Sequence, residues 1–239
     1  YKLESWIKAS HENVKDWFEV IEFTDAFNSL GNFAFNHPNY VFPELTQTGI
    51  IVKAANLAHP LLDPEKVIAN DFKIENEQFF IITGANMAGK STFLRTVSLQ
   101  IVMGNIGLPV CATFCEYHPI KLITSMRTTD SLSDDESYFF SELKRLQYIV
   151  GAIKTDKYFI ILDEILKGTN STDKAIGSRK FIQKLVKSKS TGIIATHDLS
   201  LCEVSRELPQ VQNHYFDAEI IHDELHFDYK FKDGICQNM

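Results

Sequence analysis

The sequence predicts a three-layer α/β domain with a mainly parallel central sheet, together with an N-terminal helical segment and a C-terminal antiparallel hairpin. From residue 49 onward, short apolar runs alternate with amphipathic stretches, as strands alternate with helices in α/β proteins. The runs 79–83 and 158–162 are apolar almost throughout, which is typical of strands buried on both faces of a sheet. A glycine-rich turn follows the first run, where a helix can begin against the sheet.

The first 48 residues are expected to form a helical region and a connector. A helix is predicted over residues 1 to about 30, because four apolar side chains recur at helical spacing, namely Val14, Trp17, Phe18 and Ile21. Gly31 is expected to end this helix, and an aromatic-rich connector punctuated by prolines follows. We interpret the apolar stripe as a face that packs on a core rather than as a cofactor-binding surface.

The remaining residues, 49–239, read as one α/β domain. Their patterns predict strands at 49–52, 79–83, 121–126, 158–162 and 192–196. Helices are expected at 90–103, 137–153 and 175–187. In the tail, the apolar stretches 214–220 and 225–231 flank His222 and Asp223, which predicts an antiparallel hairpin.

Composition limits the possible functions. The 239 residues, 44% of them hydrophobic, suffice for one sizeable core. The net charge of −7 excludes a general nucleic-acid-binding surface, because such surfaces are strongly basic. No apolar run approaches the roughly 20 residues that span a membrane, and the N-terminus does not read as a signal peptide, so we expect a cytoplasmic protein. Because the chain lacks a starting methionine, we also expect it to be part of a longer protein.

Two of the four cysteines, Cys111 and Cys115, lie near His118 in a spacing that resembles part of a metal site. A second pair of ligands is missing from this stretch, so the spacing does not complete a zinc site. We therefore expect these cysteines to be small apolar residues in or near a strand, in a reduced protein.

Residues 84–91 read GANMAGKS and connect the apolar run 79–83 to a helical run that begins at about Lys90. Gly84 and Gly89 permit a tight turn in which backbone N–H groups approach an anion, and the helix directs its N-terminal dipole at the same anion. The Lys90 ammonium can reach the outer phosphates of a nucleotide, and the Ser91 hydroxyl can bind Mg²⁺. The expected phosphate-binding residues are Gly84, Ala85, Asn86, Met87, Ala88, Gly89, Lys90, Ser91 and Thr92.

Two further motifs follow apolar runs. The run 158–162 ends in Asp163 and Glu164, of which Asp163 is expected to hold Mg²⁺ and Glu164 to orient and deprotonate an attacking water. His197 follows the strand predicted at 192–196. Because the carboxyl ends of neighbouring parallel strands border one crevice, His197 is expected to form a hydrogen bond with the terminal phosphate and to sense it.

Four segments resemble motifs of the MutS family of DNA mismatch repair ATPases. Residues 82–92 are similar to its phosphate loop, in which the Asn86-Met87 pair is the most specific match. Residues 163–170, DEILKGTN, resemble its DEIGRGTS stretch, with departures at Leu166, Lys167 and Asn170. Ala195-Thr196-His197 matches its histidine switch, and residues 137–142 are similar to its STFxxE signature. The likeness covers about residues 50–232.

This resemblance implies an ABC-type P-loop ATPase domain over residues 49–239 that binds ATP and Mg²⁺. It places residues 1–48 at the end of the lever helix that joins such a domain to DNA-gripping domains, so that mismatched DNA would bind outside this chain. It also implies a homodimer in which the signature serine, here Ser137, reaches the γ-phosphate of the partner. The catalytic residues implied are Lys90, Ser137, Glu164 and His197.

The resemblance also identifies the residues expected near the base. In the family, an aromatic side chain stacks on the adenine at the position where this chain has Val67. Stacking at this position is therefore expected to be weaker, or to come from another residue. Asn70 is expected to contact the base or to stabilise the loop.

We therefore expect the ATPase domain of a MutS-like protein, which couples its nucleotide state to mismatch recognition. A MutS relative that acts in recombination control or on other nucleic-acid structures would share the same site. A nucleotide-dependent dimerisation module without hydrolysis is a further alternative. A chromosome-organising ATPase is not favoured, because no heptad stretch separates Lys90 from Asp163, and the lack of an LSGGQ-like signature argues against a transporter ATPase.

Overall fold

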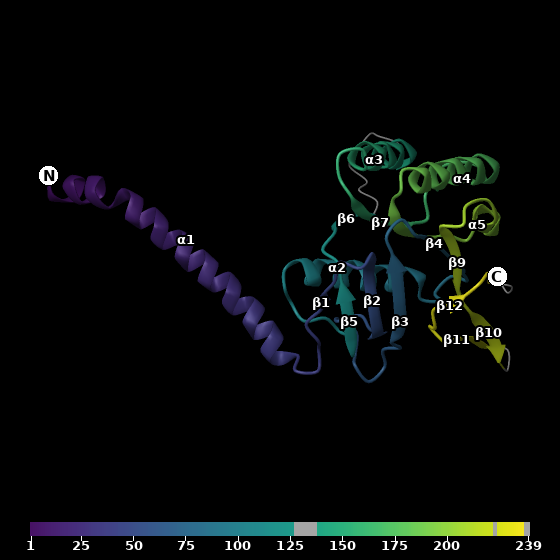
Figure 1. Ribbon diagram of the computed structural model, residues 1–239, viewed down its shortest axis with the longest axis horizontal. Coiled ribbons are helices and arrows are strands. Elements are labelled where there is room, and N and C mark those ends of the chain that lie inside the picture. The colour runs from purple at the N-terminus through teal and green to yellow at the C-terminus, as the bar shows by residue number, and fades with distance from the viewer. Residues whose placement is uncertain (127–137, 222–223, 237–239) are drawn as a thin grey trace. The chain divides into compact units, whose positions relative to one another are not determined.

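The computed structural model describes residues 1–126, 138–221 and 224–236 (Figure 1). The chain divides into two compact units, Tyr1–Tyr40 and Val41–Met239. This division lies eight residues before the expected boundary at 48/49, because the short strand β1 (Glu44–Leu45) pairs with β5 (Phe114–Tyr117) inside the second unit. None of the described helices is both long enough and apolar enough to cross a membrane.

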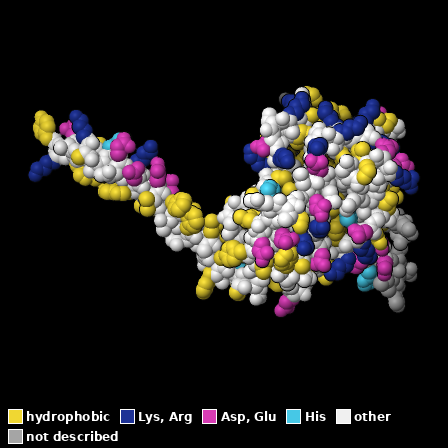
Figure 2. Space-filling model, viewed as in Figure 1, with side chains coloured by type: hydrophobic (Ala, Val, Ile, Leu, Met, Phe, Trp, Pro, Cys, Tyr) yellow, Lys and Arg dark blue, Asp and Glu magenta, His cyan; other side chains and the backbone are white. Residues whose placement is uncertain are grey.

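The first unit consists mainly of one long helix, α1 (Lys2–Asn36). The helix continues through Gly31, which therefore does not end it; a single glycine in a helix costs only about 1 kcal/mol relative to alanine. No residue of α1 is buried, and Trp17, Phe18 and Ile21 are exposed. Figure 2 shows the hydrophobic side chains along the helix. The apolar stripe thus finds no core to pack on within its own unit, contrary to the expectation from its spacing.

A six-stranded sheet organises the second unit. The strand order is β12-β9-β4-β8-β7-β6, in which the strands from β9 to β6 are parallel and β12 pairs antiparallel with β9 at the edge. The strands are β4 (Phe79–Gly84), β6 (Lys121–Ser125), β7 (Tyr158–Asp163), β8 (Thr191–Ala195), β9 (Val211–Phe216) and β12 (Lys232–Asp233). The predicted α/β class is confirmed, and four of these strands lie within one residue of their predicted bounds.

Two layers cover this sheet. Helices α3 (Tyr138–Ala152) and α4 (Ser171–Lys187) lie on one face, whereas α2 (Lys90–Asn105) and a second sheet lie on the other (Figure 1). The second sheet has the order β1-β5-β2-β3, with β2 (Ile50–Leu57) and β3 (Asn70–Glu75) antiparallel. Apolar residues of the central strands, such as Ile160 and Ile194, pack against Ile149 of α3 and Ile182 of α4. On the other face, the rings of Phe72 and Phe80 meet edge to face.

The tail differs from its prediction. Residues 211–216 form β9, which pairs parallel with β4 in the central sheet, rather than the first strand of a hairpin. The antiparallel hairpin exists, but only as β10 (Ala218–Ile221) with β11 (Glu224–Phe227); His222 and Asp223 lie outside the described residues. An apolar pattern alone does not distinguish parallel from antiparallel pairing. Strands β3 and β5 were also not predicted, and short connecting segments, η1 (Leu199–Glu203) and α5 (Val204–Glu207), link β8 to β9.

Candidate functional site

Three of the predicted motifs lie at the carboxyl ends of three neighbouring parallel strands. In the sheet register, Ala195 of β8 pairs with Ile82 of β4 on one side and with Asp163 of β7 on the other. The glycine-rich loop begins directly after β4, and His197 lies two residues beyond β8. Because parallel strands end at the same edge, the sheet register brings the loop, the acidic pair and the histidine together.

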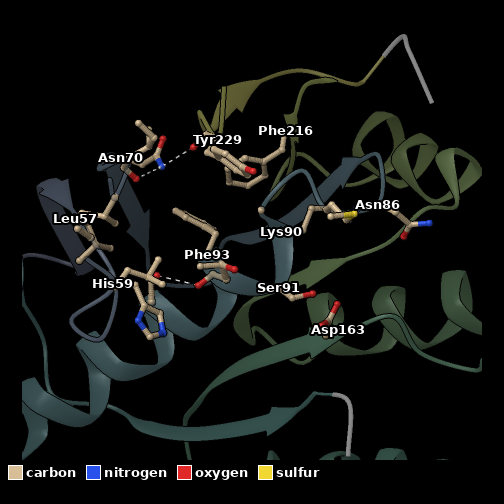
Figure 3. Close-up of a pocket in the computed structure, with 18 of the residues that line it drawn as sticks. Leu57, His59, Asn70, Asn86, Lys90, Ser91, Phe93, Asp163, Phe216 and Tyr229 are labelled. Atoms are coloured by element: carbon tan, nitrogen blue, oxygen red, sulfur yellow. Dashed lines mark hydrogen bonds between the residues drawn. The ribbon is translucent and has the colours of Figure 1, made fainter. Parts of the chain in front are cut away.

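These motifs border one cavity of about 690 Å³ (Figure 3), a size that suits a nucleotide-sized ligand. The predicted residues that line it are Val67, Asn70, Asn86, Met87, Gly89, Lys90, Ser91, Thr92, Asp163, Glu164 and His197. Gly84, Ala85 and Ala88 belong to the same loop but are not among the lining residues. Ser137 lies outside the described residues. The two cysteines near His118 are free, and the described residues hold no group of three or more His, Cys, Asp or Glu side chains that would bind a metal ion.

The loop conformation requires glycine at two positions. Gly84 has φ +142°, and a Cβ at this residue would collide with the backbone carbonyl oxygen of Phe216. Gly89 has φ +104° and is the N-cap of α2, so the first N–H groups of the helix face the cavity without an obstructing side chain. Ala88, in the same loop, is fully buried.

The Lys90 side chain is folded onto the loop. Its Nζ donates hydrogen bonds to the carbonyl oxygens of Gly84 at 2.6 Å and Ala85 at 2.7 Å, and only 6% of the residue is exposed. These bonds hold a buried positive charge at the start of α2, beside the positive end of the helix dipole. This concentration of positive charge suits a polyphosphate.

The Ser91 hydroxyl and the Asp163 carboxylate lie near one another at one end of the cavity (Figure 3). Asp163 is only 7% exposed, and its carboxylate forms no ion pair with a described residue. A hydroxyl and a carboxylate are oxygen donors of the kind that a hard cation such as Mg²⁺ binds, with several waters completing its coordination.

The Glu164 carboxylate is engaged from two sides. Its Oε1 lies 3.1 Å from Nε2 of His197, and its Oε2 lies 2.7 Å from Nζ of Lys167. Burial opposes ionisation of Glu164, but the Lys167 hydrogen bond and the neighbouring charges hold the pKa of this carboxyl below its ordinary value. Burial and the charge of Lys90 lower the pKa of His197, so this imidazole is neutral at pH 7 and can donate or accept a hydrogen bond.

The opposite end of the cavity is aromatic. Phe216 and Tyr229 lie there beside Asn70 (Figure 3), and Tyr229 is 43% exposed. Asn70 holds this segment in place: its Nδ2 donates to the Tyr229 carbonyl at 3.0 Å, and its Oδ1 accepts from the Phe231 N–H at 2.7 Å. Sequence reasoning missed both aromatic residues, because no local motif marks them and the contact between Asn70 and Tyr229 joins positions 159 residues apart.

Comparison with known proteins identifies the family. Residues 80–239 match the family model of MutS domain V. The chain belongs to the MutS family. The family membership that the motifs predicted is therefore confirmed.

Several MutS-family proteins are similar to the chain over most of its length. It is 34% identical to human MutS protein homolog 4, over 95% of the chain and 25% of that protein. It is 31% identical to the DNA mismatch repair protein MSH4 of Arabidopsis thaliana, over 82% of the chain and 25% of that protein. For the DNA mismatch repair protein MutS of Staphylococcus haemolyticus, the identity is 30%, over 98% of the chain and 27% of that protein. The chain thus spans about a quarter of the length of these relatives.

The structure shows the local contacts of two residues, Leu166 and Asn170, that differ from the MutS-family stretch DEIGRGTS. Leu166 replaces glycine and has φ +59°, a left-handed conformation that costs a non-glycine residue about 1–2 kcal/mol. Its side chain is buried against α4, where a Cβ at Gly177 would lie 2.6 Å from the Leu166 Cδ1. Asn170 replaces serine and caps α4, since its side chain accepts a hydrogen bond from the Asp173 N–H at 2.9 Å. Serine and asparagine are both favoured caps, so this replacement keeps the function of the position.

Proposed function

We propose that this MutS-family chain is a P-loop ATPase domain of the ABC type, which binds ATP with Mg²⁺ and hydrolyses it. The observation that carries the proposal is the arrangement of the glycine loop, the acidic pair and the histidine at the ends of β4, β7 and β8, around one cavity. Each motif alone is compatible with a structural role. Their convergence supplies an anion cradle, oxygen donors for a cation and a candidate base within one site.

The phosphate end would use the chain's own charges as follows. The N–H groups at the start of α2 and the Lys90 ammonium bind the β- and γ-phosphates, once Lys90 exchanges its bonds to Gly84 and Ala85 for bonds to phosphate. Ser91 and Asp163 would hold Mg²⁺, which would supply positive charge against the phosphate oxygens.

The hydrolytic step would depend on Glu164. Its lowered pKa keeps the carboxylate ionised near pH 7, as a group that orients the attacking water must be. His197 lies 3.1 Å from this carboxylate and borders the same cavity. It can therefore form a hydrogen bond with the terminal phosphate while it contacts Glu164, which would make the position of Glu164 depend on the bound phosphate.

The aromatic end would bind the adenine. Val67 lines the cavity but offers no ring, whereas Tyr229 presents an exposed ring at the cavity wall. We therefore assign base stacking to Tyr229 and assign to Asn70 the role of fixing the backbone that carries this ring.

The wider role follows from the relatives. Three are named DNA mismatch repair proteins or MutS homologues, so we propose that ATP turnover in this domain is coupled to recognition of mismatched DNA by parts of the protein outside this chain. Ser137, through a second copy of the domain, would complete the γ-phosphate site in a dimer.

Calorimetric titration with ATP and Mg²⁺, combined with steady-state phosphate release, tests the proposal. We expect Lys90→Ala to abolish binding, and Glu164→Gln to keep binding but lose turnover; chelation of Mg²⁺ should also stop turnover. Absence of ATP binding by the unmodified chain would refute the proposal. Binding without any turnover, unaffected by Glu164→Gln, would instead favour the dimerisation module that does not hydrolyse ATP.

A further inference from the structure

The segment 164–167, which carries the proposed base, is contacted by two side chains, Glu142 and Lys167, to which the motifs assign no role. Glu164 and Leu166 both have left-handed backbone conformations, with φ +50° and +59°. Such conformations persist in non-glycine residues only where the surroundings fix them. The Glu164 backbone N–H donates a hydrogen bond to the Ala195 carbonyl at 2.9 Å. The Leu166 N–H is held by Glu142 of α3, and the Glu164 side chain is paired with Lys167.

Glu142 fixes the backbone of this segment. Its Oε1 accepts a hydrogen bond from the Leu166 N–H at 2.6 Å, and its Oε2 accepts one from the Lys167 N–H at 3.0 Å. Both carboxylate oxygens are therefore used on consecutive backbone groups. This bidentate contact sets the position of the Lys167 main chain relative to α3.

Lys167 in turn holds the side chain of Glu164. Its Nζ lies 2.7 Å from Glu164 Oε2, and the two side chains are only 19% and 11% exposed. An exposed ion pair would be loose and screened by salt, whereas a largely buried pair keeps one geometry. Glu164 lines the cavity whereas Lys167 does not, so Lys167 holds the carboxylate without itself bordering the ligand space.

We propose that Lys167 is a positioning residue for the Glu164 carboxylate, and that Glu142 sets the position of Lys167. The proposal rests on the assignment of Glu164 as the residue that orients the attacking water. Such a residue must keep its direction, because a misplacement of about 1 Å at a reacting centre can cost up to about 100-fold in rate. Without Lys167, the carboxylate would lose the ion pair that holds its Oε2.

The test compares four variants of the 239-residue chain in steady-state ATP hydrolysis. In Lys167→Gln, kcat is expected to fall about 10- to 100-fold, while the KM for ATP stays within about twofold, because the contact acts on the carboxylate and not on the bound nucleotide. Lys167→Arg, which keeps the charge and the donors, should recover most of the rate. Glu142→Gln loses one of its two acceptor oxygens and should lower kcat in the same way. Lys184→Gln, at an exposed position of α4, is the matched control and should behave as the unmodified chain.

The outcomes separate this inference from the proposed function. If Glu164→Gln abolishes turnover but both Lys167→Gln and Glu142→Gln keep kcat within about twofold, the positioning role is refuted while the ATPase assignment stands. If Lys167→Gln raised KM as much as it lowered kcat, and Lys167→Arg did not restore the rate, Lys167 would have a merely structural role. This result would also refute the positioning role. Should Lys167→Gln fail to fold, Glu142→Gln and the activity of Lys167→Arg decide the question.

Discussion

The side-chain amide of Asn70, at the start of β3, donates a hydrogen bond of 3.0 Å to the carbonyl of Tyr229, near the end of the chain. The same amide accepts a bond from the Phe231 N–H, and Lys230 donates to the Ala69 carbonyl at 3.0 Å. Three bonds thus join two segments far apart in sequence at the aromatic end of the cavity. The backbone that carries the Tyr229 ring is therefore tied to the neighbouring sheet, and the ring itself lies 5.9 Å from that of Phe227 in β11.

The first prediction concerns this tie. Asn70→Ala removes the two side-chain bonds to Tyr229 and Phe231, each worth about 0.5–1.5 kcal/mol, and should release the segment that carries Tyr229. We expect the Kd for ATP to rise about 3- to 30-fold with kcat nearly unchanged, because the phosphate end keeps its contacts. Titration with a fluorescent ATP analogue measures the affinity. An affinity equal to that of the unmodified chain would show that the segment is held by other contacts.

The second prediction concerns the ring itself. Tyr229→Ala should weaken ATP binding by about 1–3 kcal/mol, the range for stacking of a base on an aromatic side chain. Tyr229→Phe keeps the ring and loses only the hydroxyl, so its affinity should stay close to that of the unmodified chain. Inorganic triphosphate, which has no base, should bind both variants equally well. Equal weakening of ATP and triphosphate binding would place Tyr229 outside the base site.

The third prediction uses two glycines with different surroundings. Gly84→Ala should destabilise the second unit strongly, because φ is +142° and the new Cβ would meet the Phe216 backbone. Gly151→Ala is the matched control: Gly151 lies in α3, with nothing within 4 Å of the new Cβ, and should stabilise the helix by about 1 kcal/mol. Urea unfolding compares the two free energies. A small effect at Gly84 would mean that the loop can shift away from β9.

The convergence of the glycine-rich loop, the acidic pair and His197 on one cavity could be predicted from the sequence because each of these parts is local. Gly84, Asp163 and His197 each follow an apolar run, and parallel order brings the ends of these runs to one edge without further information. The motif letters also led to the correct family. For these residues, the chemistry and the placement are encoded within a few positions of each other.

The rest of the site could not be predicted, because it depends on contacts between distant segments. Tyr229 lies in a segment that Asn70 holds from a distant strand, and the prediction treated residues 225–231 as an ordinary strand. Likewise, Glu142 contacts Leu166 and Lys167, which lie 24 and 25 positions away in the sequence. The helical spacing of α3 does not predict this contact. In α1, the spacing of apolar residues predicted the helix but not what, if anything, covers its apolar face.

The fourth prediction concerns the two tryptophans of the chain. Trp6 and Trp17 both lie in α1, and both are exposed. The fluorescence of the chain should therefore show water-exposed indoles that acrylamide quenches readily. Any partner that covers the apolar face of α1 should shift the emission to shorter wavelength and protect it from quenching. Protected tryptophans in the isolated chain would instead indicate self-association through this face, which dilution would reverse.

The last prediction concerns His214, whose ring stacks on Phe231 at 4.4 Å and contacts the tilted ring of Phe80 at 4.3 Å. Burial lowers the pKa of this imidazole below its ordinary 6.5, although Asp233, with Oδ1 at 3.0 Å from Nδ1, opposes the shift. Between the lowered pKa and 6.5, the unfolded chain binds a proton that the folded chain does not bind. The free energy of unfolding should therefore rise with pH through this window and level off above it, with a slope of at most about 1.4 kcal/mol per pH unit from this group.

His214→Phe keeps an aromatic ring in the stack and should flatten the slope, whereas His11→Gln, at an exposed position of α1, should not. Urea unfolding between about pH 5 and pH 7.5 measures both, and an unchanged slope in His214→Phe would assign the acid sensitivity to other groups.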